Sequence, residues 1–268
     1  MTSIERKNSF RKDLKLIILA GGKGTRLSEE TYLKPKPMVK IGDYPILWHI
    51  MKSFSCFGIN EFVATLGYKS EVVKNYFLNF KKFSGDLSID LKTGKILQSK
   101  KNWEDWKIHL LDTGKNTQTG GRIKQAMNFC SGERIMATYG DALANVNITN
   151  LLEFHKSHGK LATLTAVRPP SRFGDVNIDE GRVIDFKEKS QTGKGWINGG
   201  YFVLEPEIID YIPSLNTPFE ESPLQTLSKE GQLMAYKHQG FWQPMDVIRE
   251  KELLEKLWLE DNAPWKIW

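Results

Sequence analysis

Short apolar runs alternate with stretches of helical periodicity along most of the chain, and this alternation limits the possible folds more than any other feature. The first run, LKLIILA at residues 14–20, ends at two glycines, which is typical of a strand buried in a parallel sheet. The helical stretch after it begins at Pro45 and stops at Gly58, the usual places for these two residues. We expect an α/β fold with a doubly wound, mostly parallel sheet.

Two segments between these units have the pattern of β-hairpins. LSIDLKTGKILQS (87–99) has a turn signal at Thr93-Gly94, and VNIDEGRVIDF (176–186) has one around Glu180-Gly181. Neither a repeat nor a linker is visible. We therefore expect a polar tail over residues 1–13 and a single domain over 14–268 with a Rossmann-like core and small hairpin insertions.

Composition excludes several classes of protein. The net charge of +6, from 38 Lys+Arg and 32 Asp+Glu, is spread along the chain without a nucleic-acid-binding motif, so anionic small substrates explain it as well. No apolar run approaches the roughly 18 residues of a membrane span, and the charged start lacks the apolar core of a signal peptide. We expect a cytoplasmic protein that binds neither membrane nor nucleic acid, with Cys56 and Cys130 as buried free thiols.

A glycine-rich loop, G-G-K-G-T-R at residues 21–26, follows the first run. Its backbone amides can gather around an anion, and Arg26 adds a fixed positive charge. A dinucleotide-binding fingerprint would need glycine where Leu27 stands, and no Walker A motif occurs, which argues against hydride transfer and P-loop chemistry. Lys36 lies between two prolines that restrict its backbone, which suits a phosphate contact, although a surface loop of solvated lysines is the alternative.

Several separated motifs resemble those of sugar-phosphate nucleotidylyltransferases. They are LAGGKGTRLSEETYLKPKPMVKIGDYPIL (19–47), YGD (139–141), FKEKS (186–190), WINGG (196–200) and FWQPMD (241–246). TGGR (119–122), RFG (172–174) and APWK (263–266) resemble the glucose-1-phosphate cytidylyltransferase branch more narrowly. The resemblance implies a homo-oligomeric enzyme that joins CTP and a sugar 1-phosphate, α-D-glucose 1-phosphate above all, into a CDP-sugar for surface polysaccharide, with release of pyrophosphate.

The attacking phosphate oxygen in such a reaction is already ionised at neutral pH, since the second pKa of a phosphate monoester is about 6. No general base is needed, in agreement with the lack of an obvious Ser-His-Asp or Cys-His constellation. The demand falls on neutralising charge and aligning the reacting groups.

Site residues follow from the resemblance, position by position. It implies catalytic roles for Arg26 on the leaving pyrophosphate, Lys36 near the reacting phosphates and Lys189 on the sugar phosphate. The nucleotide-binding residues it implies are Leu19, Gly21, Gly22, Gly24, Thr25, Arg26, Lys36, Thr119, Gly121 and Arg122, with Arg122 on the base. The substrate-binding residues it implies are Gly174, Glu188, Lys189, Asn198 and Gly199. Asp141 and Asp246 would hold Mg²⁺, a hard ion that prefers carboxylates, phosphate oxygens and water.

Simpler roles remain open for some of these residues. Asp141 could be a turn residue, Asp246 a helix N-cap and Arg122 a helix-start arginine that contacts phosphate or carboxylate. Three residues depart from the family pattern beside the expected acceptor pocket, so another phosphorylated acceptor stays an alternative to glucose 1-phosphate. They are Ala142 after YGD, Asp175 after RFG and Ser190 after EK.

Rival functions are use of another nucleotide, which Arg122 in TGGR argues against, and a non-catalytic nucleotide-sugar-binding regulatory subunit.

Two further expectations concern side chains outside the site. His155 and His158, three residues apart on a helix, read as an exposed face without a third metal ligand. Trp258, Trp265 and Trp268 supply contact surface for an oligomer.

Overall fold

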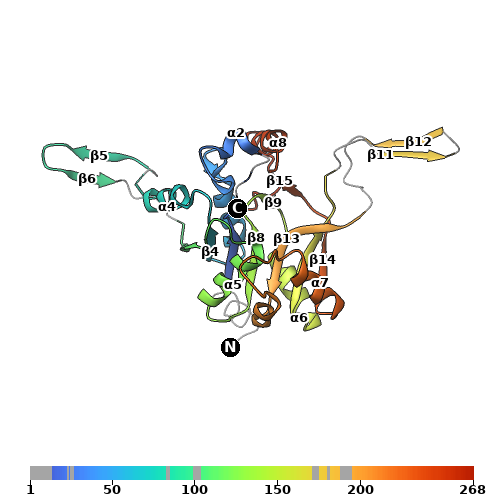
Figure 1. Cartoon of the computed structure of the whole chain (residues 1–268). Helices are drawn as coiled ribbons and strands as arrows, with labels where there is room; N and C mark the ends of the chain where they lie inside the picture. The colour runs from blue at the N-terminus through green and yellow to red at the C-terminus, as the bar shows by residue number, and fades with distance from the viewer. Residues whose placement is uncertain are drawn as a thin grey trace, which may run out of the picture.

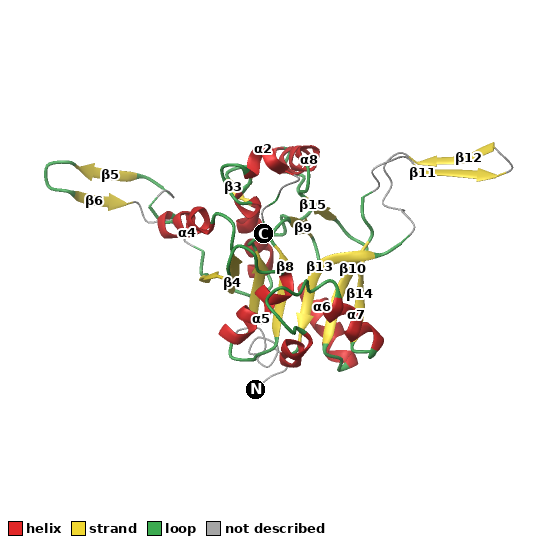
Figure 2. Cartoon of the chain, in the orientation of Figure 1, coloured by secondary structure: helices red, strands yellow, loops and turns green. Residues whose placement is uncertain are grey.

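A seven-stranded sheet forms the centre of the molecule in a computed structural model, which describes residues 14–22, 24, 27–82, 85–98, 104–170, 175–179, 182–187 and 195–268. The strand order is β14-β10-β13-β8-β1-β4-β7. The strands are β1 Lys15–Leu19, β4 Glu61–Leu66, β7 Lys107–Asp112, β8 Ile135–Tyr139, β10 Ala162–Val167, β13 Ile197–Leu204 and β14 Leu233–His238. Only β13 runs antiparallel to its neighbours β10 and β8. The predicted mostly parallel α/β sheet is confirmed (Figures 1 and 2).

Helices pack on both faces of this sheet. The α-helices are α2 Ser28–Thr31, α3 Ile46–Ser55, α4 Ser70–Asn79, α5 Thr119–Phe129, α6 Ile148–His158, α7 Ser222–Lys229 and α8 Ile248–Leu259, and the 3₁₀ helices are η2 Lys36–Met38 and η3 Pro206–Tyr211. Side chains of β1 alternate between the two faces, as the two-residue period of a strand requires. Leu16 and Ile18 join the core under α3, whereas Ile17 and Leu19 join the core under α5. The sheet is therefore doubly wound.

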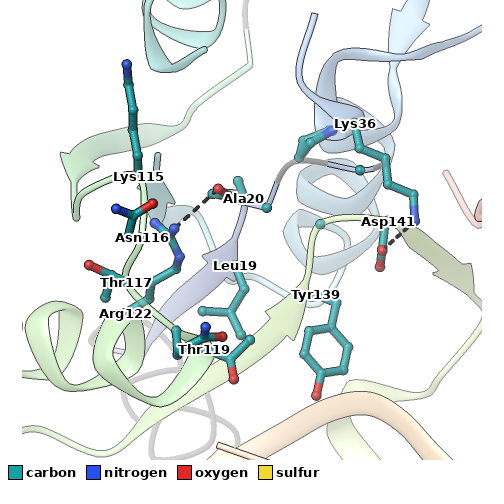
Figure 3. Close-up of a pocket in the computed structure, with 16 residues that line it drawn as sticks. Leu19, Ala20, Lys36, Lys115, Asn116, Thr117, Thr119, Arg122, Tyr139 and Asp141 are labelled. Atoms are coloured by element: carbon teal, nitrogen blue, oxygen red, sulfur yellow. Dashed lines mark hydrogen bonds and ion pairs between the residues drawn. The ribbon is translucent and has the colours of Figure 1, made fainter. Parts of the chain in front are cut away.

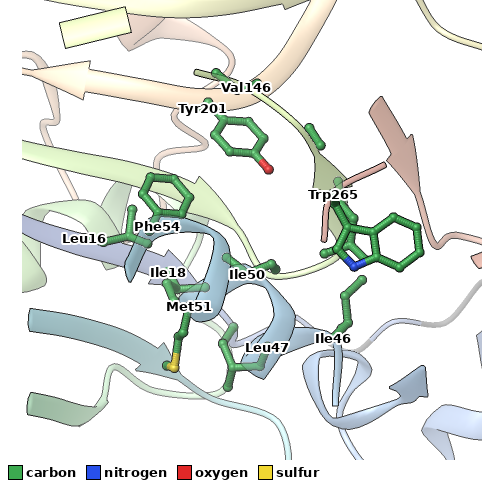
Figure 4. Packing of buried hydrophobic residues seen from close by; sticks show 14 of the residues in the cluster. Leu16, Ile18, Ile46, Leu47, Ile50, Met51, Phe54, Val146, Tyr201 and Trp265 are labelled. Atoms are coloured by element: carbon green, nitrogen blue, oxygen red, sulfur yellow. The ribbon is translucent and has the colours of Figure 1, made fainter. Parts of the chain in front are cut away.

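Helix α3 is buried along most of its length, with eight of its ten residues buried. It begins directly after Pro45, which takes the N-cap position, and the chain leaves it at Gly58 with a φ of 83°. Its Phe54 ring stacks on Tyr201 of β13 with the ring centroids 5.6 Å apart (Figure 4). This packing ties the antiparallel strand to the parallel part of the sheet.

Both predicted hairpins form, and in Figure 1 they lie on opposite sides of the sheet. One consists of β5 Leu87–Asp90 and β6 Lys95–Gln98, and the other of β11 Asp175–Asp179 and β12 Arg182–Lys187. Two smaller antiparallel pairs complete the structure, β2 Lys40–Ile41 with β3 Tyr44–Pro45 and β9 Ala142–Ala144 with β15 Trp242–Pro244.

Of the three C-terminal tryptophans expected to supply contact surface, Trp265 packs inside the chain, so for this residue the expectation was wrong. Trp265 is fully buried and stacks on Phe241 with the ring centroids 5.6 Å apart. Its indole nitrogen donates to His49 Nδ1 at 3.4 Å. Trp258 and Trp268 are partly buried against the same core. An aromatic C-terminus packs equally well onto its own chain or onto a partner, so sequence alone could not separate the two.

Two more expectations about single side chains were wrong. Cys56 is exposed, and only Cys130 is buried. His155 is only 2% exposed, because α6 turns it toward the sheet, where Thr163 of β10 and Glu205 after β13 bond to its two ring nitrogens. In the part of the chain that the structure describes, no helix has the length and apolar character to cross a membrane.

Candidate active site

A pocket of about 520 Å³ lies where β1 and β8 end. Its lining comes from the glycine loop, the proline-flanked lysine, the segment before α5 and the end of β8 (Figure 3). The lining residues are Leu19, Ala20, Gly21, Gly22, Gly24, Lys36, Pro37, Lys115, Asn116, Thr117, Gln118, Thr119, Arg122, Tyr139, Gly140 and Asp141. The carboxyl edge of an open α/β sheet is the usual place for a ligand.

The described part of the glycine loop needs its small residues for close contacts. Gly24 has a φ of 62°, and a Cβ there would lie 3.0 Å from Lys36 Cβ. A Cβ on Gly21 would lie 2.1 Å from the guanidinium of Arg122. Thr25 and Arg26, predicted to bind the nucleotide, lie outside the described residues.

Lys36 bridges the two predicted metal-binding carboxylates. Its Nζ donates to Asp141 Oδ2 at 2.7 Å and to Asp246 Oδ1 at 2.5 Å (Figure 3 shows the bond to Asp141). Asp246 reaches this place because β15 pairs with β9 and Met245 N donates to Asp141 O at 2.9 Å. The burial of Lys36 favours the neutral amine, but the two carboxylates together outweigh this effect and raise the pKa of Lys36. Three residues far apart in sequence thus form one charged cluster.

The helix-cap alternative for Asp246 does not fit. The N-cap of α8 is Val247, and the carboxylate that accepts from the backbone nitrogens of Asp246 and Val247 is that of Glu250. The carboxylate of Asp246 instead lies against Lys36. Its position comes from the charged cluster and from β15, not from a role in starting the helix.

Arg122 is a buried cation in the first turn of α5, with an exposed fraction of 4%. Nη1 donates to Leu66 O at 2.9 Å and to Thr113 Oγ1 at 2.5 Å, and Nη2 donates to Gly21 O at 3.2 Å. All three acceptors are neutral, and burial lowers the pKa of Arg122. A buried guanidinium normally has a carboxylate partner. No described carboxylate forms a salt bridge with Arg122, although the charge of nearby Asp112 partly opposes the effect of burial on its pKa. Arg122 therefore brings a positive charge to the pocket wall.

Of the remaining predicted nucleotide-binding residues, Thr119 lines the pocket and Gly121 does not. Gly121 packs away from the pocket, since a Cβ on it would lie 2.3 Å from Leu215 O. The hydroxyl of Thr119 donates to Glu220 and accepts from Phe219 N at 2.8 Å. Gly174, Glu188 and Lys189 lie outside the described residues.

Asn198 and Gly199 lie on β13, the strand next to β8. The amide nitrogen of Asn198 donates to Tyr139 OH at 3.3 Å, and Gly199 O accepts from Trp242 Nε1 at 2.8 Å. Asn198 therefore contacts Tyr139, which lines the pocket, and Gly199 contacts Trp242 of β15.

Sequence reasoning missed part of the lining. Lys115, Asn116 and Thr117 line the pocket from the loop that follows β7, and Tyr139 lines it from the end of β8. The signal was present, since both segments follow predicted strands at the ligand-binding edge. Burial raises the pKa of Tyr139, and its hydroxyl donates to Glu220. Among the described residues no group of three or more His, Cys, Asp or Glu side chains forms a metal cluster.

Comparison with known proteins gives consistent results. The model of the nucleotidyl transferase family matches residues 15–254. The chain is 48% identical to the glucose-1-phosphate cytidylyltransferase of Salmonella typhi and 44% identical to the probable glucose-1-phosphate cytidylyltransferase of Bacillus subtilis, in each case over 95% of this chain and 100% of the relative. The crystal structure of HddC from Yersinia pseudotuberculosis superposes with a TM-score of 0.68 at 22% identity, over 91% of this chain and 99% of that one, which shows the same fold.

Proposed function

This chain belongs to the nucleotidyl transferase family, and we propose that it transfers the cytidylyl group of CTP to glucose 1-phosphate, giving CDP-glucose and pyrophosphate. The observation that carries the proposal is the pairing, in one pocket, of a buried arginine with a lysine–carboxylate cluster. Figure 3 places Leu19 and Ala20 between them. The identity of the relatives named for this activity supports the choice of nucleotide and acceptor.

We propose that Arg122 contacts the base. Cytosine offers two acceptors, O2 and N3, whereas uracil and thymine carry a hydrogen on N3. An arginine that donates to both positions faces the N3–H donor of uracil or thymine instead of an acceptor. In a desolvated pocket this mismatch weakens binding of the wrong base. The burial of Arg122 and the neutral acceptors that its guanidinium contacts support this role.

We propose that Lys36 and Arg26 neutralise the phosphates, with Arg26 on the leaving pyrophosphate. The sugar phosphate attacks as an anion, so the residues have to align and neutralise rather than remove a proton. Gly21, Gly22 and Gly24, with Thr25, would leave room for the triphosphate. Gly174, Glu188 and Lys189, together with Asn198 and Gly199, are our proposed acceptor residues.

The carboxylates of Asp141 and Asp246 fit Mg²⁺. They already converge on a single cation, the Lys36 ammonium, and Mg²⁺ in proteins is commonly held by one or two carboxylates together with substrate phosphates and water. When bound there, Mg²⁺ would offset the charge of the triphosphate. The role of the chain is to keep both carboxylates together, which the β9–β15 pair supports.

We infer that residues 14–268 form one catalytic domain, because strands from both halves of the chain enter one sheet. We propose that this domain acts in the cytoplasm. We also propose a homo-oligomer. The β5–β6 hairpin supports an oligomer, because Leu91 is 91% exposed and Ile96 is 62% exposed. Large apolar side chains that lie together on a surface often mark a protein contact. Light scattering after gel filtration should show a smaller particle for Leu91→Lys/Ile96→Lys than for the wild type.

The test of the activity uses purified protein, Mg²⁺, each nucleoside triphosphate in turn and a panel of sugar 1-phosphates. We expect pyrophosphate release with CTP and glucose 1-phosphate at a far higher rate than with other pairs. Another acceptor would revise the role of the departures at Ala142, Asp175 and Ser190. Nucleotide-sugar binding without turnover on any pair would support a regulatory subunit instead.

A further inference from the structure

Thr113 lies directly after β7 and bonds to the guanidinium of Arg122. It is 4% exposed, and its Oγ1 lies 2.5 Å from Arg122 Nη1 and 2.8 Å from Leu66 O. A hydroxyl has one hydrogen to give, and a guanidinium can only donate. The hydrogen of Thr113 therefore goes to Leu66 O, and the oxygen accepts from Arg122. The orientation of this hydroxyl is fixed.

The hydrogen bonds of Arg122 account for three of its five N–H groups. Both hydrogens of Nη1 are used, by Leu66 O and Thr113 Oγ1, and one hydrogen of Nη2 is used by Gly21 O. The two N–H groups left over among the described contacts are on Nε and Nη2, two nitrogens in one plane. Such an edge can donate to two adjacent acceptors at once. Thr113 thus decides which edge of the guanidinium stays free for a ligand.

Glycines on both sides leave room for the guanidinium in this position. A Cβ on Gly21 would lie 2.1 Å from Nη1, and a Cβ on Gly67 would lie 2.8 Å from Nη2. Either contact is too short for real atoms, so any larger residue would push the group out of position. The loop after β4, which contains Gly67, and the loop after β1, which contains Gly21, together form a slot for the guanidinium.

We propose that Thr113 is a positioning residue for nucleotide selection, because its hydroxyl holds Arg122 with the Nε and Nη2 edge free for two adjacent acceptors of a base. The inference rests on the proposed function for the identity of that base as cytosine. Without the hydroxyl, one N–H of Nη1 loses its acceptor in a buried place, and the guanidinium gains by turning toward another one. The turn misaligns the edge while the positive charge stays in the pocket.

The test compares Thr113→Val, which keeps the shape and removes the hydroxyl, with Thr113→Ser, which keeps the hydroxyl. The readout is the ratio of kcat/KM for CTP to that for UTP, with melting temperatures measured in parallel. We expect Thr113→Val to lower the ratio by about tenfold or more, through loss of CTP selectivity, and Thr113→Ser to stay near the wild type. Thr65→Val is the matched control, since Thr65 is also buried and its hydroxyl bonds to Ile18 O instead.

Gly67→Ala provides a second route that leaves Thr113 unchanged, because its Cβ would lie 2.8 Å both from Nη2 and from Gly21 O, the acceptor of Nη2. It should lower the same ratio even if Thr113→Val folds poorly. An equal loss of kcat/KM for both nucleotides in these variants, or a ratio that Thr113→Val leaves unchanged, would overturn the positioning role. Failure of the proposed function is seen separately and first, as wild-type protein that shows no preference for CTP.

Discussion

Lys36 and Asp246 form an ion pair 2.5 Å long across 210 residues of chain. The same ammonium also bonds to Asp141, so one lysine compensates two carboxylates in a part-buried cluster. Two such carboxylates without a cation would repel each other. The lysine therefore keeps them together in the absence of a divalent ion.

Asp141→Asn and Asp246→Asn should each remove turnover while the fold remains. An amide keeps the shape and loses the negative charge that Mg²⁺ needs, so we expect kcat/KM to fall by about a hundredfold or more. Steady-state rates over a range of Mg²⁺ concentrations, with circular dichroism as the check of folding, provide the measurement. Near-normal activity at limiting Mg²⁺ would show that the changed carboxylate is not a ligand.

Lys36→Met should let divalent ions bind without nucleotide. The ammonium lies between the two carboxylates and competes with any second cation there, and the thioether does not. We expect tighter binding of Mn²⁺ to the nucleotide-free variant, measured by electron paramagnetic resonance, together with a loss of turnover. Lys52→Met is the control, since it breaks the ion pair with Glu104 instead. Equal Mn²⁺ affinity in wild type and Lys36→Met would contradict the competition.

Lys189→Ala and Arg26→Ala should affect different substrates. We place Lys189 on the phosphate of the acceptor and Arg26 on the leaving pyrophosphate of the nucleotide. The first change should therefore raise the KM for glucose 1-phosphate more than the KM for CTP, and the second should do the reverse. Initial rates with both substrates varied give all four constants. If both variants shift both constants alike, the two subsites are not separate.

The fold was largely predictable because its strands and helices have distinct periods. The reversal of β13 was not, since the run WINGGYFVLE has the same pattern in either direction. At the site, Asp141 could be placed from its position after a predicted strand. The pairing of Lys36 with Asp141 and Asp246 could not, because it depends on the β9–β15 pair bringing distant segments together.

The same limit applies to Arg122 and His155. Periodicity placed Arg122 at the start of a helix, but its orientation is set by Leu66 O, Thr113 Oγ1 and Gly21 O from other segments. The spacing of His155 fitted an exposed helix face, yet Thr163 and Glu205 surround it from neighbouring elements. Helical spacing gives the relation between residues on one helix and no information about what packs against it.

A series of hydrogen bonds through His158, Thr163 and His155 fixes which ring nitrogen of each histidine carries the proton. Lys160 N donates to His158 Nδ1 at 2.9 Å, which leaves the proton of neutral His158 on Nε2, facing Thr163 at 2.7 Å. The hydroxyl of Thr163 then donates to His155 Nδ1 at 2.8 Å, and His155 Nε2 donates to Glu205 at 3.1 Å. Every ring nitrogen in this series has a hydrogen-bond partner when both rings are neutral.

The stability of the protein should therefore fall as the pH drops below about 6.5. Burial lowers the pKa of His155, and burial also lowers the pKa of His158, His238 and His49, the last to about 4. The unfolded chain takes up these protons first, so stability is complete above the unfolded pKa and is lost as the pH falls toward the folded values. Urea unfolding at several pH values should show this slope.

His155→Gln should make the slope shallower by up to one proton, or at most about 1.4 kcal/mol per pH unit. Glutamine is polar but does not titrate, so the comparison isolates the proton of this ring from those of the other three histidines. Parallel plots of unfolding free energy against pH for the wild type and the variant would show that His155 does not contribute to the pH dependence of stability.

The position of Asp246 near the end of the sequence determines when this carboxylate is added during synthesis. The last strand of the sheet ends at His238, and both Asp246 and the buried Trp265 come after it. A ribosome thus completes the whole sheet before it delivers the second carboxylate and the tryptophan that fills the core beside His49. A chain that stops after His238 would contain every strand of the sheet and still lack Asp246, the second carboxylate that we propose for Mg²⁺.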